Sequence, residues 1–457
     1  MGRNPAMTYF IDPFGCVKNQ VDAENMMACL DKAGWTAASS APEADLLIVN
    51  SCGFIESAKR ESINAVLLWR RQYPEKKILL AGCLAQRYAK ELGESLPEAD
   101  GLLGTGDIAG IVPAAMKLMG CRPAAAQFAG EIPPGGRPLL SLPGSAYVKI
   151  SEGCDNRCSF CAIPLIRGGL SSRPLRHIID ECKALLQREI KELILIGQDT
   201  GSYGMDNSPE PRMPVKPGTG AAQGLAGLME AISRLEGNFW VRLLYIHPDH
   251  FPLPILDIME NDRRFLPYFD IPFQHGSEKI LRLMNRRGDA DAYLALIKTI
   301  RSRLPDAAIR STLMTGFPGE TEEDFRQLLD FQKKASLDWL GCFAYSREEG
   351  TQSWSMKGRV AKKTASDRKR LIEEAQIPIT ERQMDRFAGK LFDALVEEKI
   401  EASSAGEQDF YLGRLPCQAP DVDGSAVIIG EKALNPGAFV QCRVIARRGF
   451  DLEARPV

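Results

Sequence analysis

Residues 146–161 read AYVKISEGCDNRCSFC, a strand-like apolar run over Tyr147–Ile150 followed by three closely spaced cysteines. The cysteines are Cys154, Cys158 and Cys161. No fourth cysteine follows until Cys182, whereas ferredoxin-type clusters take four thiolates. Three thiolates around a four-iron cube leave one iron free to bind a substrate, as catalytic zinc does at its open coordination position. The alternative is a structural zinc site, but such a site needs four protein ligands and this motif supplies three. The spacing therefore predicts a [4Fe-4S] cluster with one open iron, placed directly after a strand.

The region around this motif, residues 146–380, alternates between strand-like and helix-like stretches. The predicted strands are Tyr147–Ile150, Glu192–Ile196, Trp240–Leu244, Phe269–Ile271, Ala308–Leu313 and Leu340–Ala344. Helices are predicted between them, over 176–188, 277–285, 291–303 and 322–335. About six such strands fit a full or partial (β/α) barrel, whose chemistry lies at the carboxyl ends of the strands. The long loop 201–222 follows one of those ends, and loops of that length are usually functional lids or disordered segments.

Three further strand-like runs precede this region, and a cysteine follows each of them. The runs are Thr8–Ile11, Asp45–Val49 and Lys77–Ala81, and the cysteines are Cys16, Cys52 and Cys83. The helix-like stretches 20–33 and 56–71 separate the runs, which predicts a parallel α/β sheet. Carboxyl ends of neighbouring parallel strands meet at one edge, where α/β folds place ligands, so three thiols there could hold a second cluster. The alternative is three buried structural cysteines, since free cysteine is among the most buried residue types.

The six remaining cysteines show no such pattern, and we expect them to be packing residues. They are Cys29, Cys121, Cys182, Cys342, Cys417 and Cys442. The C-terminal stretch 389–457 has short β-type runs with turn signals at Asp423-Gly424 and Pro436-Gly437, which predicts a small five-stranded antiparallel barrel of the OB kind. Its predicted strands are Leu391–Glu397, Asp409–Leu412, Ser425–Ile429 and Phe439–Ile445.

A stretch rich in Pro, Gly and Ala separates the N-terminal sheet from the central region and predicts a linker. The predicted domains are 1–125 for the N-terminal α/β domain, 126–145 for the linker, 146–385 for the core and 386–457 for the barrel.

The composition is that of a globular protein, with 44% apolar and 25% charged residues in a chain of 457. The net charge of −2 gives no global attraction to nucleic acid. No run approaches the 18 or so apolar residues of a membrane span, and the N-terminus lacks the apolar region of a secretory signal. We therefore expect a cytoplasmic protein without membrane association, whose cysteines stay reduced and available as ligands.

Together these features resemble the methylthiotransferases, radical S-adenosylmethionine (SAM) enzymes with an N-terminal three-cysteine domain, a radical SAM core and a C-terminal TRAM barrel. The similarity is strongest to the branch that modifies a ribosomal protein. It is carried by SEGCDNRCSFCAIPLIRGGLSSRP (151–174), IGQDTGSYG (196–204), YFDIPFQHGSEKIL (268–281) and STLMTGFPGETEEDF (311–325). The transfer-RNA branch usually has Gln-Asn-Val where this chain has Gln198-Asp199-Thr200. One departure is Gly169, where the family often has an acidic residue.

The resemblance implies methylthiolation of the β-carbon of one aspartate in protein twelve of the small ribosomal subunit. It also implies two [4Fe-4S] clusters, with SAM on the open iron of the central one and sulfur carried by the N-terminal one. The implied partners are the ribosomal protein and a reducing flavodoxin- or ferredoxin-like donor. By motif position, the expected SAM-contacting residues are Gly197, Gln198, Asp199, Gly316, Pro318 and Glu320. Asp199 could equally cap a helix, and the segment 316–320 could be a plain strand-to-helix turn.

Two other functions are open at this point. A transfer-RNA adenosine methylthiotransferase would use the same chemistry, and a basic stripe on the barrel would favour it. Phosphate contacts dominate nucleic-acid affinity, so a barrel that binds RNA should be basic. Residues 389–457 instead hold 8 Lys and Arg against 11 Asp and Glu, a net charge of −3. A non-enzymatic carrier of electrons would need no open iron, so the missing fourth cysteine argues against it.

Overall fold

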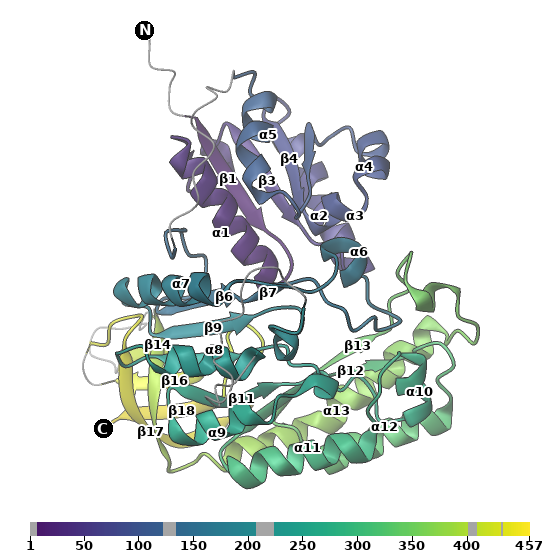
Figure 1. Ribbon diagram of the computed structural model, residues 1–457, viewed down its shortest axis with the longest axis vertical. Coiled ribbons are helices and arrows are strands. Elements are labelled where there is room, and N and C mark those ends of the chain that lie inside the picture. Colours follow the sequence, from purple (N-terminus) through teal and green to yellow (C-terminus); the bar gives the residue numbers. More distant parts are fainter. Residues whose placement is uncertain (1–6, 122–133, 207–223, 401–408, 431–432) are drawn as a thin grey trace, which may run out of the picture.

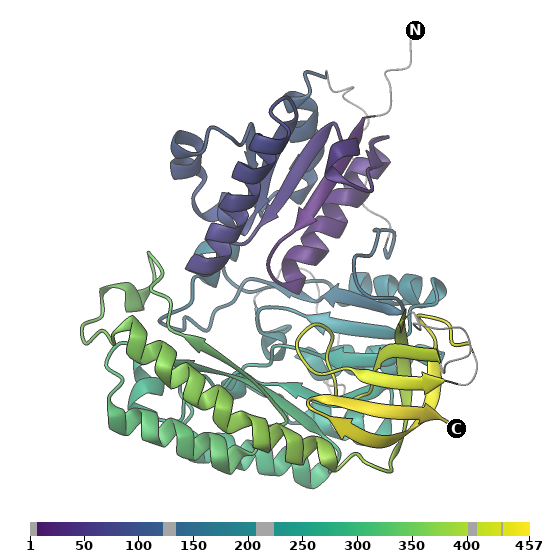
Figure 2. The same cartoon turned by 180° about the vertical axis from the view of Figure 1, so that it is seen from behind.

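The strand order of the computed structural model gives two parallel sheets and one closed barrel (Figure 1). The structure describes residues 7–121, 134–206, 224–400, 409–430 and 433–457. The N-terminal sheet stands above the central sheet in Figure 1, and the barrel lies at the lower left. The reverse view in Figure 2 shows the barrel seated on the open side of the central sheet. Residues 126–133 of the predicted linker and 207–222 of the predicted loop lie outside the described residues.

The N-terminal sheet has five parallel strands, with helices on both faces. Its strand order is β2 (Thr36–Ala37), β1 (Thr8–Pro13), β3 (Leu46–Ser51), β4 (Lys77–Gly82) and β5 (Gly101–Leu103). The apolar side chains of one face pack against α1 (Val17–Lys32) and α5 (Ile111–Leu118). Those of the other face pack against α2 (Glu56–Gln72) and α4 (Ala89–Ser95). The three predicted strands are confirmed, whereas β2 and β5 are too short to show a pattern in the sequence.

The central sheet is an open barrel of six parallel strands. Their order is β13 (Trp339–Ala344), β12 (Ala308–Thr315), β11 (Phe265–Asp270), β10 (Trp240–Leu243), β9 (Glu192–Ile196) and β6 (Ser145–Lys149). The helices between and after them are α7 (Leu175–Gln187), α8 (Gly224–Ser233), α9 (Pro254–Asn261), α10 (Glu278–Leu283), α11 (Ala290–Arg303), α12 (Glu322–Ala335) and α13 (Lys362–Asp385). The partial barrel is confirmed. Strand β11 begins at Phe265, four residues earlier than predicted, because Pro267 interrupts the β-type pattern.

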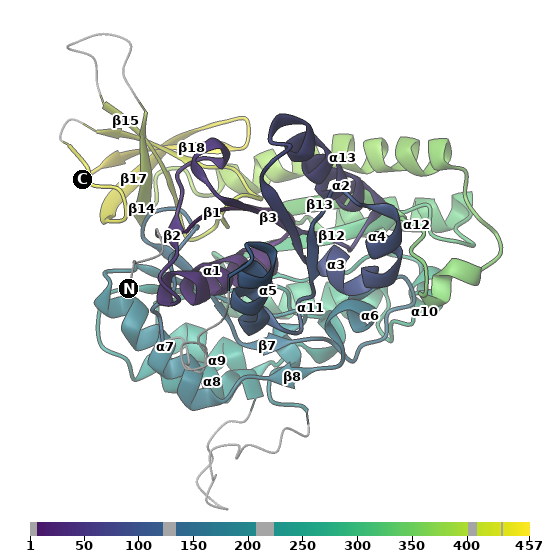
Figure 3. The same ribbon diagram turned by 90° about the horizontal axis from the view of Figure 1, so that it is seen from above.

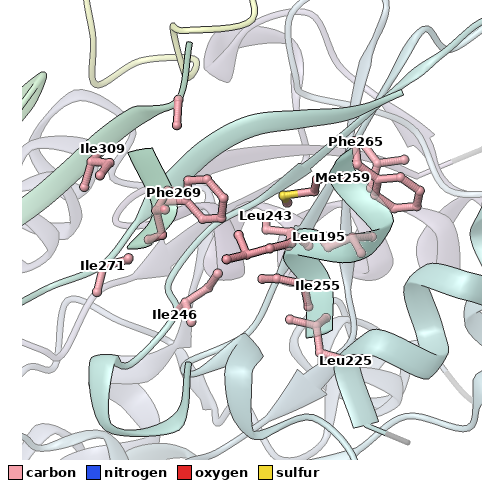
Figure 4. Packing of buried hydrophobic residues seen from close by; sticks show 14 of the residues in the cluster. Leu195, Leu225, Leu243, Ile246, Ile255, Met259, Phe265, Phe269, Ile271 and Ile309 are labelled. Atoms are coloured by element: carbon pink, nitrogen blue, oxygen red, sulfur yellow. The ribbon is translucent and has the colours of Figure 1, made fainter. Parts of the chain in front are cut away.

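The outer face of this sheet is packed against its helices, which holds the strand ends in fixed positions. In Figure 4, Leu195, Leu243 and Phe269 of β9, β10 and β11 point toward Leu225 of α8 and Ile255 of α9. All five side chains are fully or almost fully buried. Burying each such side chain contributes about 1.5–3 kcal/mol, so the cluster fixes the sheet that carries the strand-end residues.

The C-terminal barrel is closed by five strands in the order β14-β15-β16-β18-β17. The strands are β14 (Leu391–Ile400), β15 (Asp409–Arg414), β16 (Ala426–Gly430), β17 (Phe439–Arg448) and β18 (Asp451–Pro456). The pairings are antiparallel except for β16 with β18, which is parallel. The OB-like barrel is thus confirmed. The sequence pattern missed β18, in which only Leu452 and Ala454 are apolar and buried.

Buried charges join the barrel to the inner face of the central sheet. Arg414 of β15 donates hydrogen bonds to Glu192 of β9, to Glu397 of β14 and to Ser145. Arg242 of β10 donates to the other carboxylate oxygen of Glu192 at 2.7 Å. Burial alone would raise the pKa of Glu192, but Arg414 and Arg242 lower it to about 2. The carboxylate is therefore ionised at neutral pH and depends on both arginines.

Replacing Arg414 by methionine is expected to destabilise this junction by about 3–5 kcal/mol, because Glu192 and Glu397 then lose a buried counter-charge. Urea or thermal unfolding of the two proteins side by side measures the loss. Arg443→Met in β17 is the matched control, since Arg443 is exposed and a surface charge contributes about 0–1 kcal/mol. Equal stability of the two variants would contradict the prediction.

Candidate active site

The central cysteine trio lies in the loop between β7 (Ser151–Glu152) and α6 (Ile163–Arg167). The amide of Cys161 donates to the Cys158 carbonyl at 3.0 Å, and Arg157 has a left-handed φ of 51°, so the loop folds back on itself. Burial raises the pKa of Cys154 to about 11 and of Cys161 to about 12, and the nearby Cys158 raises both further. The three cysteines are thus half-buried in one loop, with Cys158 close enough to Cys154 and Cys161 to act on both thiols. Among the described residues, no three His, Cys, Asp or Glu side chains are close enough to hold a single metal ion.

Asp199 organises the wall of this loop. It is 1% exposed and accepts hydrogen bonds from the Asn156 side chain at 2.8 Å and from the His247 amide at 3.0 Å. It also caps the short helix η3 (Thr200–Ser202) through the Gly201 amide. The Nε2 atom of His247 lies 3.8 Å from the Cys158 Sγ. Asp199 thus does cap a helix, and its oxygens are occupied by the chain itself.

Three buried oxygen atoms without hydrogen-bond partners follow the carboxyl ends of β6, β9 and β11, of which β6 and β9 are neighbours and β10 separates β9 from β11. They are Ser151 Oγ, Gln198 Oε1 and Gln274 Oε1. Gly197 leaves room for the first, since a Cβ there would lie 2.6 Å from Ser151 Oγ. Gln274 follows β11 with a left-handed φ of 70°, a conformation that costs a non-glycine residue about 1–3 kcal/mol. Unsatisfied polar atoms are costly, so these three atoms at the carboxyl edge of the sheet, called the cradle below, suit a polar ligand such as SAM.

The segment 316–320 forms a buried turn between β12 and α12. Glu320 accepts a hydrogen bond from the Gly316 amide at 2.8 Å and is paired with Arg368. The Nε2 atom of His275 lies 3.4 Å from Glu320, and Pro318 is buried in the same turn. These contacts give the turn a structural role, and a contact of Gly316, Pro318 or Glu320 with SAM stays a prediction.

The N-terminal cysteine trio lies along one edge of the first sheet. Cys16 caps α1 after β1, Cys52 follows β3, and Cys83 begins α3 (Cys83–Arg87) after β4. These three strands are neighbours, and a Cβ on Gly15 would lie 3.3 Å from Cys52 Sγ. Burial raises the pKa of Cys83 to about 12 and that of Cys52 as well, and Cys16 adds to both rises. Cys16 itself is exposed, which does not suit a packing residue.

Helix α6, which begins two residues after Cys161 of the central trio, lies directly below α3, which begins at Cys83 of the N-terminal trio (Figure 1). Cys83 packs against Ala162 and Ile166, and Ala162 follows Cys161 in the chain. Figure 3, seen from above, also has α3 next to α6. Two constellations that are about 70 residues apart in the sequence thus border the same region of the molecule.

A buried guanidinium connects the two sites. Arg167 donates to Cys83 Sγ at 3.2 Å, to Asp22 Oδ2 at 2.8 Å and to Asn19 Oδ1 at 2.6 Å. Its other terminal nitrogen donates to Glu152 at 2.8 Å. Glu152 accepts a further hydrogen bond from the side-chain nitrogen of Gln198, whose Oε1 is one of the three oxygens without a hydrogen-bond partner. Arg167 therefore ties the N-terminal thiols to the cradle of the central site.

A lysine lies beside the same region. Lys18 of α1 is 8% exposed, and its ammonium lies 2.9 Å from the centre of the Tyr245 ring. Burial lowers the pKa of Lys18 to about 8. Tyr245 follows β10 and has a left-handed φ of 64°.

A polar cavity of about 280 Å³ opens on the outer side of the cysteine loop. Its lining includes Asn156 and Asp155 of the loop, His247, His250 and Arg287. Burial lowers the pKa of His247 to about 2, so this ring is neutral and has no charge to offer the neighbouring thiol.

Comparisons with known proteins agree with this architecture. Family models match at residues 8–104 (Uncharacterized protein family UPF0004), 148–331 (Radical SAM superfamily) and 388–457 (TRAM domain). The chain is 48% identical to the ribosomal protein uS12 methylthiotransferase RimO of Treponema denticola, over 97% of this chain and 99% of that protein. It is 38% identical to the RimO of Syntrophomonas wolfei, over 96% and 97%. The chain belongs to the RimO family of methylthiotransferases.

A radical SAM domain in a RimO-family chain implies SAM and a [4Fe-4S] cluster as cofactors, and the protein is a transferase. Among solved structures, the fold is similar to the radical SAM methyltransferase TsrM of Kitasatospora setae, which was solved with cobalamin and a [4Fe-4S] cluster. The TM-score is 0.54 at 15% identity, over 76% of each chain, so the likeness concerns the fold alone. No helix among the described residues is long and apolar enough to span a membrane.

Sequence reasoning placed the cysteines of this RimO-family chain at strand ends but missed the polar residues between them. Asp22 lies in the predicted helix-like stretch 20–33, Lys18 and Asn19 lie just before it, and Arg167 has no spacing relation to either trio. One signal was available, namely that four of the five residues of the segment KNQVD (18–22) are polar and that this segment begins two residues after Cys16. Polar residues at the end of a buried strand are themselves buried only when they have hydrogen-bond or ion-pair partners.

Proposed function

We propose that the protein is a radical SAM enzyme that attaches a methylthio group to the β-carbon of an aspartate in ribosomal protein uS12. The observation that carries the proposal is the contact of Cys83, in the N-terminal trio, with Ala162, Ile166 and Arg167, which directly follow the central trio. Transfer of a group between two sites requires that both border the substrate, since proximity removes much of the entropic barrier. The identity of the relatives, which are named for uS12, supports the ribosomal protein as the substrate.

In this proposal Cys154, Cys158 and Cys161 hold the cluster that binds SAM, and Cys16, Cys52 and Cys83 hold a second [4Fe-4S] cluster. When bound, these groups would supply the 5′-deoxyadenosyl radical and the sulfur that no side chain can provide. The chain itself contributes thiols, which must lose their protons to bind iron. A flavodoxin- or ferredoxin-like protein would supply the electron.

The SAM-contacting residues in this proposal divide into two groups. Gly197 and Gln198 border the cradle directly, through Ser151 Oγ and the unpartnered Gln198 Oε1. Asp199 acts through the groups it fixes, because its carboxylate holds the Asn156 side chain and the His247 amide. We propose that the turn at Gly316, Pro318 and Glu320 closes the opposite side of the cradle.

The barrel supports a protein substrate more than a nucleic acid, but less strongly than its net charge suggests. Glu397 is paired with Arg414 at the junction with the core, and Asp423 accepts a hydrogen bond from Tyr268 at 2.6 Å. These buried carboxylates do not contribute to the surface that a substrate meets. A basic ribosomal protein would still be steered by the acidic remainder. A ribosomal protein as the substrate would place the enzyme in the cytoplasm.

The test is to offer the anaerobically reconstituted enzyme either uS12 or bulk transfer RNA, together with SAM, sulfide and a reductant. We expect uS12 to gain the mass of one methylthio group in place of one hydrogen, on one aspartate, and transfer RNA to stay unmodified. Peptide mass spectrometry and nucleoside analysis measure the two products. A methylthioadenosine product with unmodified uS12 would select the transfer-RNA function instead.

A further inference from the structure

The ammonium of Lys18 takes part in no ion pair in the part of the chain that the structure describes, although Cys16, Asp270 and Glu152 attract it from further away. Lys18 is 8% exposed, and none of the hydrogen bonds or ion pairs among the described residues involves its ammonium. Its close contact is the face of the Tyr245 ring, 2.9 Å from Nζ. Burying an unpaired charge is costly, so a lysine in this position needs an anion for full compensation.

The nearby carboxylates are already held by other cations. Asp22 is paired with Lys149 and Arg167, and Glu152 is paired with the same two residues. Asp270 is paired with Arg310 at 3.4 Å and accepts a hydrogen bond from the Tyr245 amide. Besides the Cys16 thiol, these are the acidic groups that face Lys18 from the elements packed around it. The lysine is thus left over when the surrounding ion pairs are formed.

Tyr245, whose ring lies against the Lys18 ammonium, has a strained backbone conformation. Tyr245 has a φ of 64°, and its carbonyl accepts hydrogen bonds from the amide and the hydroxyl of Thr200 at 2.9 and 3.2 Å. Left-handed non-glycine residues cost about 1–3 kcal/mol and cluster where a ligand is positioned. The strain keeps the aromatic face under Nζ, where the cation–π contact holds the ammonium without consuming its hydrogen-bond donors.

Lys18 also lies next to the N-terminal trio, two residues after Cys16. Its neighbour on the same helix, Asn19, is uncharged and accepts a hydrogen bond from Arg167. A carboxylate bound by Lys18 would therefore lie beside the thiols of Cys16, Cys52 and Cys83. In an aspartate side chain, the β-carbon is bonded directly to the carboxylate carbon. Fixing the carboxylate fixes the position of the reacting carbon to within one bond length.

We propose that Lys18 binds the side-chain carboxylate of the substrate aspartate and is the residue that makes the enzyme specific for an acidic side chain. This inference rests on the proposed function, because it assumes an aspartate substrate. A neutral adenine base would leave the ammonium unpaired, so the same residue discriminates against the alternative substrate.

A double-mutant cycle between enzyme and substrate tests the proposal. Reconstituted holoenzyme, either wild type or Lys18→Met, binds a fluorescent uS12 peptide that carries either the target aspartate or asparagine at that position, and anisotropy gives the Kd. For the wild type, asparagine is expected to weaken binding by about tenfold or more, the lower end for a close buried charge pair. For Lys18→Met, both peptides should bind within about twofold of each other, and the aspartate peptide should lose its methylthiolation.

Two further variants complete the design. Lys32→Met changes an exposed lysine at the other end of α1 and should keep the wild-type preference for aspartate. Lys18→Arg keeps the charge and should restore part of the preference. A Lys18→Met protein that still prefers aspartate tenfold would overturn the proposal. So would the loss of half of its iron, because Lys18 would then support the N-terminal cysteines and not the substrate. If the wild type does not modify the aspartate peptide at all, the proposed function fails and this proposal fails with it.

Discussion

Cys16→Ala is expected to abolish methylthiolation of the substrate while reductive cleavage of SAM continues. Cys16 belongs to the N-terminal trio, whereas under the proposed function the cleavage of SAM would depend on Cys154, Cys158 and Cys161, which precede α6. Cys16 is exposed, so its removal leaves no cavity in the core. Iron content is expected to fall from about eight to about four atoms per chain, as one of two four-iron clusters is lost. Chromatography of 5′-deoxyadenosine and mass spectrometry of the peptide measure the two activities separately.

The control for this variant is Cys29→Ala. Cys29 lies on the same helix, is partly buried against the N-terminal core and has no place at a strand end. We expect it to keep both activities and all of its iron, with a stability change of about 1 kcal/mol. If Cys16→Ala still methylthiolates the peptide at the wild-type rate, the N-terminal trio does not carry the sulfur.

The positions of the cysteines could be predicted because they depend on local patterns alone. An apolar run followed by a cysteine within five residues occurs at β1, β3 and β4, and these strands turn out to be neighbours in a parallel sheet. The carboxyl ends of neighbouring parallel strands lie at one edge, so the grouping of Cys16, Cys52 and Cys83 follows from the fold. Their role as cluster ligands stays a prediction.

The residues between the trios could not be predicted, because their partners are far away in the sequence. Arg167 and Asp22 are 145 residues apart, and Lys149 and Asp22 are 127 apart. No periodicity links such pairs. The N-terminal part of α1 illustrates the limit, since Lys18 and Asn19 are polar and yet buried. An amphipathic pattern assigns polar residues to solvent, whereas this helix lies between two domains and presents them to the core.

The sequence pattern missed strand β18 and the first residues of β11 for a different reason. In β18 the apolar residues Leu452 and Ala454 alternate with the charged residues Asp451, Glu453 and Arg455. Pro267 interrupts the β-type pattern in the sequence because it has no N–H to donate, although β11 runs through it from Phe265 to Asp270. Strand pairing overrides weak local preference in both segments, which single-sequence patterns cannot show.

Arg167→Met is expected to cost about 3–5 kcal/mol of stability and to impair the N-terminal cluster, because one guanidinium serves four partners at the junction. Glu152 and Asp22 would be left with Lys149 as their remaining cation. Burial raises the pKa of Cys83 to about 12, and the guanidinium 3.2 Å from its sulfur acts against that rise. Without it the thiol gives up its proton less readily, so iron loading should fall toward about four atoms per chain.

The pH dependence of this loss separates the ion pairs from packing. Burial alone would raise the pKa of Glu152, but Lys149 and Arg167 lower it to about 2, from an ordinary value of 4.5. A carboxyl group with a lowered pKa stabilises the fold above pH 4.5, and that contribution disappears as the pH falls toward 2. The difference in unfolding free energy between wild type and Arg167→Met should therefore be largest at neutral pH and should narrow on acidification. Arg176→Met, which changes an exposed arginine with a side chain 84% exposed, is the control and should show a difference below about 1 kcal/mol throughout. A gap for Arg167→Met that stays constant from pH 7 to pH 3 would mean that lost packing, and not lost charge, weakens the junction between the two cysteine sites.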